Sequence, residues 1–147
     1  MSSHYQELNV STHGAFEVCD ITANIRAAVR ASGISEGMVT ITSLHTTCAI
    51  SINEHEERLL QDIQEFFLKM APAEGAYKHN DLHLRENIPP DEPKNAHAHL
   101  IAMMLGNSET LTVHDAALGL GRYQSVLLLE LDGPRERTLA VQVMGVS

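Results

Sequence analysis

Histidine is the residue type through which this chain can do chemistry, with nine copies against ten lysines and arginines together. Most of them fall in three short, polar or turn-rich segments, which hold His45, the pair His79 and His83, and the pair His97 and His99. Imidazole is neutral near physiological pH, ligates borderline metals and can still move protons. One histidine from each segment, with one coordination position left open, predicts a catalytic zinc-type site, and manganese, nickel or cobalt would also fit.

The spacing inside these segments leaves alternatives open. His79 and His83 share a face only on a helix, which the neighbouring prolines disfavour, so one can be a ligand while the other is merely exposed. His97 and His99 point about 200° apart on a helix, so only one of them faces a given site. For His45 the alternative to metal binding is a strand-end histidine that bonds a neighbouring carbonyl.

Two carboxylates lie close in sequence to these histidines. Glu54 follows the His45 segment and Asp81 lies between His79 and His83. Each is a candidate fourth ligand, a partner that orients an imidazole, or a general base. The plain alternatives are a helix-start carboxylate for Glu54 and a turn-forming aspartate for Asp81.

The backbone around His45 is expected to break. Apolar residues occupy odd positions in the predicted strand 38–44 and even positions in the next one, 48–52. A strand cannot switch its buried face without a bulge or a break, so the break falls between Ser43 and Thr47. Irregular backbone beside a titratable residue is common in active sites, although a plain sheet corner explains it too.

Three helices are predicted from caps and periodicity. Asp20 caps one that runs to Ser32 and stops at Gly33, Asn53 caps a second, and Asn95 caps a third over 96–105. The second helix is expected to bury six apolar side chains, Leu59, Leu60, Ile63, Phe66, Phe67 and Met70. The long segment 73–94 between the last two helices is expected to be an ordered, functional loop.

The remaining chain reads as antiparallel strands. A strand at 5–11 is expected to continue as a hairpin through 16–18, and 123–131 and 138–144 are expected to pair across an Asp-Gly-Pro turn. The predicted fold is therefore a single α+β domain, 1–147, with mostly antiparallel sheets and about three helices. The last two strands are apolar at nearly every position, as in strands buried on both faces, so we expect a neighbouring subunit to help cover them.

Composition excludes some partners. The net charge of -9 argues against nucleic acid and anionic membrane surfaces, which are bound through clustered lysine and arginine. Cys19 and Cys48 are expected to be reduced thiols in a cytoplasmic protein. The first ten residues carry no signal pattern, and no apolar run approaches the roughly 20 residues that span a bilayer. We therefore expect a small-molecule substrate as the partner.

Several motifs together resemble the YjbQ family, whose members are described as secondary thiamine-phosphate synthases. The segments that carry the resemblance are His45 to Glu54, Tyr77-x-His79, Asn95 to Leu100, Gly106, Gly119 to Gln124, Glu130, and Asp132 to Arg135. The resemblance implies an α+β subunit in a homotrimer, with a histidine-lined site that often carries a divalent metal. It also implies site positions at His45, Asn53, Glu54, His79, His99 and Gln124, which selects His99 over His97.

The activity that the resemblance implies joins a hydroxymethylpyrimidine diphosphate to a thiazole phosphate and releases pyrophosphate. The predicted metal ligands are His45, His79 and His99, with zinc or manganese favoured and magnesium admitted. The predicted catalytic residues are His79, Glu54 and Asp81, and the predicted substrate-binding residues are Asn53, Arg122 and Gln124. Two positions depart from the family pattern, because Tyr123 stands where a tryptophan is usual and Ile101 where a lysine is frequent.

Two alternatives to the synthase remain open. The first is a metal-assisted hydrolase of a small phosphorylated or carbonyl compound, in which Glu54 or Asp81 activates water. The second is a non-catalytic, metal-binding or ligand-binding trimer whose histidines serve storage or interface stability.

Overall fold

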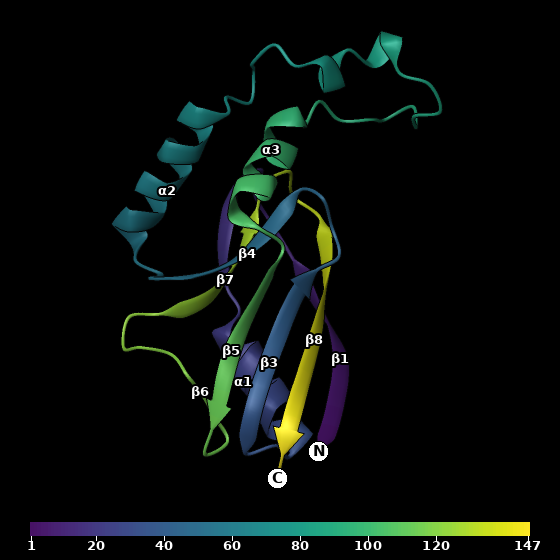
Figure 1. Ribbon diagram of the computed structural model, residues 1–147. Coiled ribbons are helices and arrows are strands. Elements are labelled where there is room, and N and C mark those ends of the chain that lie inside the picture. The colour runs from purple at the N-terminus through teal and green to yellow at the C-terminus, as the bar shows by residue number, and fades with distance from the viewer.

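Two antiparallel sheets of unequal size form the body of the protein, and the computed structural model describes all residues 1–147 (Figure 1). The larger sheet has the strand order β1-β8-β3-β5-β6 and the smaller one the order β2-β7-β4. The strands are β1 Ser2–Ser11, β2 Glu17–Asp20, β3 Glu36–Ser43, β4 Cys48–Asn53, β5 Ser108–His114, β6 Ala117–Leu118, β7 Ser125–Glu130 and β8 Glu136–Val146. The helices are α1 Thr22–Ser32, α2 Glu57–Met70 and α3 Ala96–Leu105. This arrangement confirms the predicted α+β class with three helices.

The smaller sheet is covered on both faces within one chain. Val126 and Leu128 of β7 pack into a core shared with α1 and the larger sheet, while Leu127 and Leu129 pack against α3. The neighbouring subunit that the apolar sequence of β7 suggested is therefore not needed to cover that strand. β8 alternates instead, with residues such as Leu139 buried and the residues between them partly exposed.

The predicted break after Ser43 is confirmed, and it is the point at which the chain passes from one sheet to the other. β3 ends at Ser43 in the larger sheet and β4 begins at Cys48 in the smaller one, so the chain crosses between sheets at His45. The crossover is fixed at both ends, because the His45 amide donates to Ser43 Oγ at 3.2 Å and the Leu131 amide donates to the Thr47 carbonyl at 3.2 Å.

Both predicted hairpins are wrong. β1 pairs with β8 rather than with β2, and β7 pairs with β2 and β4 rather than with β8. The turn between β7 and β8 is a second crossover from the smaller sheet to the larger one. Turn residues specify that the chain reverses, but they do not specify which sheet receives the next strand.

The helix ends agree with the prediction only in part. α3 spans the predicted residues, and α1 ends at Gly33, whose φ of 68° is the left-handed conformation that glycine favours. α2 begins after Glu56, whose carboxylate accepts the Arg58 and Leu59 amides, so the predicted cap at Asn53 is wrong. Asn53 is the last residue of β4.

The predicted buried stripe on α2 is also wrong. No residue of α2 is fully buried, and Phe66 and Met70 are 58% and 55% exposed. The helix lies at the side of the molecule, beside α3 (Figure 1). The other four predicted side chains of the stripe are only partly buried.

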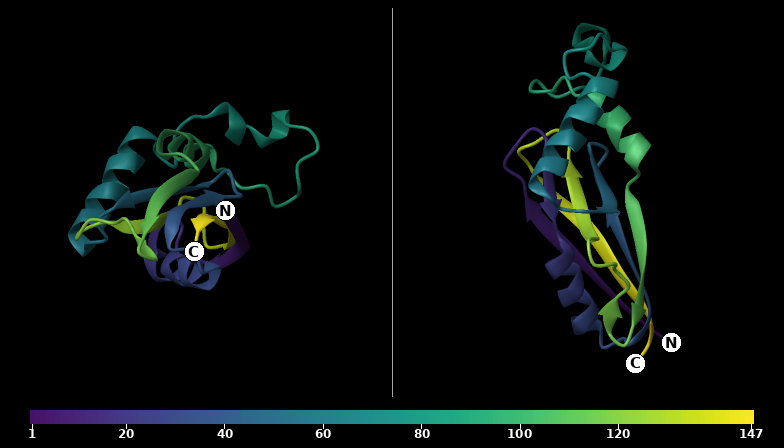
Figure 2. Two further views of the ribbon diagram at one scale, coloured as in Figure 1. Left: turned by 60° about the horizontal axis from the view of Figure 1, so that its bottom comes forward. Right: turned by 90° about the vertical axis from the view of Figure 1, so that its left-hand side faces the viewer.

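Segment 71–95 forms the end of the molecule opposite the two termini (Figure 2). It contains two short 3-10 turns, η1 Lys78–Asn80 and η2 Leu82–Leu84. The Ala96 amide donates to Asn80 Oδ1 at 3.1 Å, which ties this segment to the first turn of α3. None of the helices is long and apolar enough to cross a membrane.

Candidate functional site

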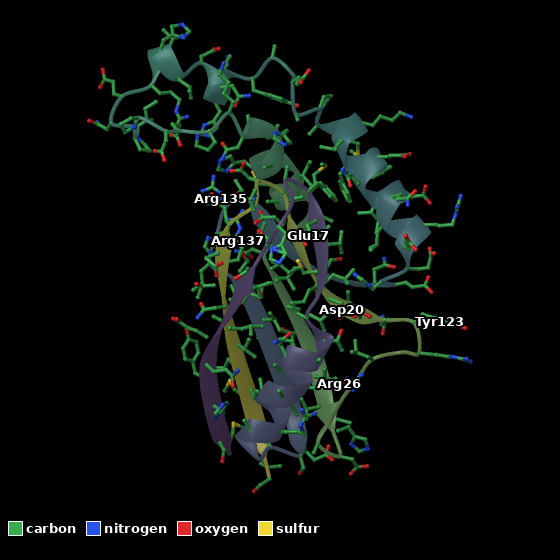
Figure 3. All side chains as sticks on the ribbon, turned by 180° about the vertical axis from the view of Figure 1, so that it is seen from behind. Glu17, Asp20, Arg26, Tyr123, Arg135 and Arg137 are labelled. Carbon is green, nitrogen blue, oxygen red and sulfur yellow. The ribbon has the colours of Figure 1, made fainter.

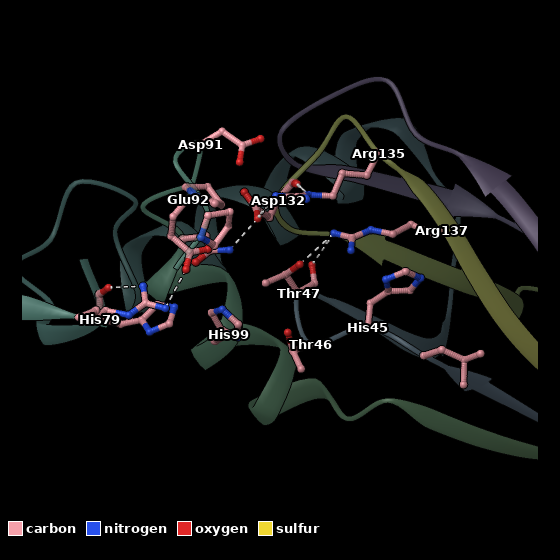
Figure 4. Close-up of a pocket in the computed structure, with 15 residues that line it drawn as sticks. His45, Thr46, Thr47, His79, Asp91, Glu92, His99, Asp132, Arg135 and Arg137 are labelled. Atoms are coloured by element: carbon pink, nitrogen blue, oxygen red, sulfur yellow. Dashed lines mark hydrogen bonds and ion pairs between the residues drawn. The ribbon is translucent and has the colours of Figure 1, made fainter. Parts of the chain in front are cut away.

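A polar cavity of about 690 Å³ lies where the two crossovers, the segment 79–95 and the start of α3 meet (Figure 4). Fifteen residues line it, and Leu44 is the one hydrophobic side chain among them. The polar lining consists chiefly of three histidines, three arginines and three carboxylates: His45, His79, His99, Arg85, Arg135, Arg137, Asp91, Glu92 and Asp132.

The three predicted histidines therefore reach one cavity from three distant segments of the chain. His79 and His99 lie closest, with ring centres 4.8 Å apart and an edge-to-face angle of 81°. The guanidinium of Arg85 donates to the His79 carbonyl at 3.0 Å, which fixes the backbone of that segment. His99, rather than His97, lines the cavity, as the sequence resemblance implied.

His45 is held differently from the other two. Its Nε2 accepts the Thr138 amide at 2.9 Å, so in the neutral ring the proton is on Nδ1. The nitrogens of the three rings do not gather within 4.8 Å of one another; the only trio of potential ligand atoms that does so is exposed and consists of Glu36, His114 and Asp115. The cavity thus presents a His79–His99 dyad and, separately, the His45 ring as a hydrogen-bond donor.

Burial favours the neutral form of two of these imidazoles by lowering their pKa. Burial lowers the pKa of His99, and the neighbouring ring of His79 lowers it further. Burial also lowers the pKa of His45, with the positive charge of Arg137 acting in the same direction. A neutral imidazole is the form that can bind a metal ion.

Arg135 and Arg137, which the sequence analysis did not select as site residues, lie with His45 on the side of the cavity away from His79 and His99 (Figure 4). Arg137 donates through Nε to Glu130 at 2.9 Å and through Nη2 to Glu130 and to Thr47 Oγ1, the latter at 3.0 Å. Arg135 donates to Asp132 at 2.9 Å. The available signal was the Asp-Gly-Pro-Arg-x-Arg sequence, in which the two arginines are two residues apart at the start of a strand and so share a face.

Glu130 holds Arg137 in place from the interior of the protein. Its side chain is fully buried, and Thr12 Oγ1 donates to it at 2.6 Å. Burial alone would raise the pKa of Glu130, but the hydrogen bonds from Arg137 and Thr12 hold it below its usual value. Because Arg137 also bonds Thr47, the buried pair fixes the crossover that carries His45.

Asn95 contributes an atom that has no partner. Its Nδ2 donates to Asp132 Oδ2 at 2.7 Å, which leaves Oδ1 facing away from that carboxylate. Oδ1 is buried and accepts no hydrogen bond, although Asn95 lines the cavity. Nδ1 of His97, two residues along the chain, is the other buried side-chain atom without a partner.

A smaller cavity of about 410 Å³ adjoins the first and shares His45, Thr46 and His99 with it. Its other lining residues are less polar and come mainly from α3 and the residues after it: Cys48, Ala102, Met103, Gly106 and Asn107. A ligand that contacts the histidines can therefore extend from a polar space into a more apolar one.

The other predicted site residues lie outside both cavities. Asn53 and Glu54 are at the far end of β4, and five residue steps of a strand place Asn53 about 16 Å from the cavity end. Gln124 adjoins Asn53, because Ser125 pairs with Asn53 across β4 and β7. Arg122 is on the same exposed loop, where it stacks on Tyr123, and this loop lies well away from Arg135 and Arg137 (Figure 3).

Asp81 also lies outside the histidine cavity. It lines a separate depression together with Tyr77 and Lys94. Within one chain the structure therefore brings together His45, His79 and His99, but not the five other predicted residues, Asn53, Glu54, Asp81, Arg122 and Gln124.

Comparison with known proteins places the chain among proteins of similar length. The family model described as UPF0047 protein YjbQ-like matches residues 6–146. The UPF0047 proteins of Methanothermobacter thermautotrophicus and Archaeoglobus fulgidus are 38% and 39% identical, covering 99% and 94% of this chain and 94% and 99% of their own lengths. A solved YbjQ-like protein of unknown function from Sulfolobus solfataricus superposes with a TM-score of 0.89 at 36% identity, over 98% of each chain.

Proposed function

Because this chain belongs to the YjbQ/UPF0047 family, we propose that it is a secondary thiamine-phosphate synthase whose histidine-lined cavity binds a divalent metal ion and small phosphorylated substrates. The observation that supports the site is the convergence of His45, His79 and His99 on one polar cavity. In the proposed reaction, a thiazole nitrogen forms a bond to the pyrimidine methylene carbon, the bond from that carbon to oxygen breaks, and pyrophosphate leaves.

The spacing of the His79 and His99 rings is that of two ligands of one metal ion. Two imidazoles on one tetrahedral ion, each about 2 Å from it, have ring centres about 5 Å apart, close to the 4.8 Å found here. Two nitrogen ligands favour zinc or manganese over magnesium, and two carboxylates of the lining, Glu92 and Asp132, are already held in ion pairs with Arg85 and Arg135. A bound ion would offset the negative charge of the leaving diphosphate.

The chain's own residues orient the leaving group in this proposal. His45, Arg135 and Arg137 offer N–H groups from the same side of the cavity (Figure 4). Donors that are fixed before the reaction stabilise charge as it develops, because they need no reorganisation. The adjoining, less polar cavity beside Ala102 and Met103 has room for a ring.

A homotrimer is part of the proposal. Asn53, Glu54 and Gln124 form a second cluster at the far end of β4. They take part in the same reaction only if a neighbouring copy brings this end to the histidine cavity, and we propose that a trimer does so.

The test is product formation by untagged protein supplied with both substrates and a series of divalent metals. His79→Ala should abolish the activity, while His83→Ala is a matched control, because His83 is exposed in the same segment and does not line the cavity. Product formation that is unchanged in His79→Ala would contradict the proposal.

The geometry gives less support to the alternatives. The hydrolase needs a free carboxylate to activate water, but the two predicted candidates, Glu54 and Asp81, lie outside the cavity. Of the carboxylates that line it, Glu92 and Asp132 are paired with arginines, which leaves only the exposed Asp91. The non-catalytic alternative is tested by metal analysis, since absence of bound metal and unchanged stability in chelator would favour it over the synthase.

A further inference from the structure

Every arginine that lines the cavity is already paired with a carboxylate. The three pairs are Arg85 with Glu92, Arg135 with Asp132, and Arg137 with the buried Glu130. Asp91 also lines the cavity and forms no ion pair or hydrogen bond. Leaving the histidines aside, four carboxylates, Glu92, Asp132, Asp91 and the buried Glu130, outnumber the three arginines by one negative charge. Net charge alone does not attract an anion to this cavity.

The lining of the cavity nevertheless keeps donors that no protein atom uses. The side chain of Arg137 is 3% exposed, and its Nε and Nη2 make all its hydrogen bonds, which leaves Nη1 without a partner. Arg135 likewise uses Nε and Nη2 on Asp132 and leaves Nη1 free. Two neighbouring guanidinium groups with free N–H groups are typical of phosphate and carboxylate binding.

We infer that the wall formed by Arg135 and Arg137 is a subsite for a phosphate-type anion, and that this subsite fills only together with a divalent cation at His79 and His99. The inference rests on the proposed metal site and goes beyond it, because it assigns the anion to named residues and makes the two binding events depend on each other.

The dependence follows from the charge of the cavity. A doubly charged anion at Arg135 and Arg137 adds negative charge to a cavity whose lining, with Asp91, is already negative. A divalent cation at His79 and His99 makes the net charge of the cavity positive, which attracts the anion. Charges interact more strongly in a partly buried cavity than in water, because the dielectric constant is lower there. Coupling between two ligands is reciprocal, so the anion must tighten cation binding by the same factor.

A purely structural role for Arg137 does not account for its unused nitrogen or for Arg135 beside it. Its bonds to Glu130 and Thr47 would suffice for that role, and they require neither Arg135 beside it nor an unused nitrogen on the lining of a cavity. Arg135 likewise keeps a free Nη1, and it lines the same cavity. These two free N–H groups are what an anion in the cavity would use.

Isothermal titration calorimetry of the intact protein tests the coupling with inorganic phosphate and Mn²⁺ as probes. We expect phosphate to bind at least about 10-fold more tightly with saturating Mn²⁺ than without it, and Mn²⁺ to gain the same factor from phosphate. Equal phosphate affinity in the two conditions, or no binding of Mn²⁺, would overturn the inference.

Variants locate the subsite. Arg135→Gln, at a side chain that is 44% exposed, should keep the fold and Mn²⁺ binding while losing most of the phosphate affinity. Arg58→Gln, at an exposed position on α2, is the control and should leave both affinities unchanged. Unchanged phosphate binding in Arg135→Gln would overturn the assignment. Coupled binding by a protein that makes no thiamine phosphate would support this inference and refute only the synthase.

Discussion

His45 and Thr138 are joined by a 2.9 Å hydrogen bond from the Thr138 amide to His45 Nε2, which links the first crossover between the sheets to the start of β8. The lone pair that a metal ion would need is therefore already engaged by the backbone. This relationship separates His45 from the other two histidines and leads to the first prediction.

His45→Ala should weaken metal binding much less than His79→Ala or His99→Ala. The expected loss of Zn²⁺ affinity is under 3-fold for the first and above about 10-fold for the other two, because only His79 and His99 have adjacent, unengaged rings. Titration with Zn²⁺ followed by calorimetry measures this. Equal losses in all three variants would indicate that His45 leaves Thr138 and becomes a ligand.

The buried pair of Glu130 and Arg137 should dominate the stability of this end of the protein. Glu130→Gln leaves Arg137 without its counter-charge, and breaking such a pair costs roughly 3–5 kcal/mol of unfolding free energy. The urea midpoint measures the change. Glu136→Gln is a suitable control, since Glu136 is exposed and its loss should change the free energy by less than about 0.5 kcal/mol.

Glu130 also predicts how stability depends on pH. Its pKa is lowered in the folded protein, so its contribution is present above the pKa of an unfolded glutamate, about 4.3, and is lost as the pH falls through the lower, folded value. Urea unfolding between pH 7 and pH 3 should therefore show a smaller fall in stability for Glu130→Gln than for the unmodified protein. Parallel curves would show that other carboxylates determine the acid sensitivity.

Asp91→Asn should increase anion affinity without a metal ion. Asp91 lines the cavity and has no partner, so its removal takes away the one unbalanced negative charge. We expect phosphate to bind a few-fold more tightly, which is the size of an exposed charge interaction. Glu86→Gln is the matched control, because Glu86 is exposed in the same segment but does not line the cavity. An equal gain in both variants would point to a general effect of net charge.

The proposed homotrimer predicts a particle of three 16.1 kDa chains in solution. Light scattering coupled to size-exclusion chromatography gives the mass directly. A monomer at micromolar concentration would remove the proposal that Asn53 and Gln124 of one copy act at the cavity of another.

Signals within a few residues of sequence predicted the helix ends and the strand break that depend on those residues alone. The bounds of α3, the stop of α1 at Gly33 and the break near His45 all follow from caps, glycine and alternation over a few residues. They did not predict the start of α2, because Glu56 competed with Asn53 for the cap. The exposed apolar face of α2 could not be predicted either, since periodicity shows that a face exists and not what covers it.

The sequence indicated less clearly the site residues whose position depends on the pairing of distant strands. The histidines could be selected as site residues because an imidazole can bind a metal ion or move a proton wherever it lies. Arg135 and Arg137, by contrast, resembled ordinary turn and strand residues. Their role depends on β8 joining the larger sheet while β7 stays in the smaller one, and the sequence was consistent with a simple hairpin instead. Sheet membership is decided by distant strands, so nothing near residue 130 reveals it.

The meeting of the two crossovers has a consequence for the motions of the protein. Thr47 in the first crossover accepts the Leu131 amide of the second, and Arg137 bonds Thr47 from the strand that follows. An occupant of the cavity touches both crossovers and thereby clamps the two sheets to each other. Deuterium uptake at these backbone amides should then slow in both sheets together, as one cooperative unit, when the cavity is filled.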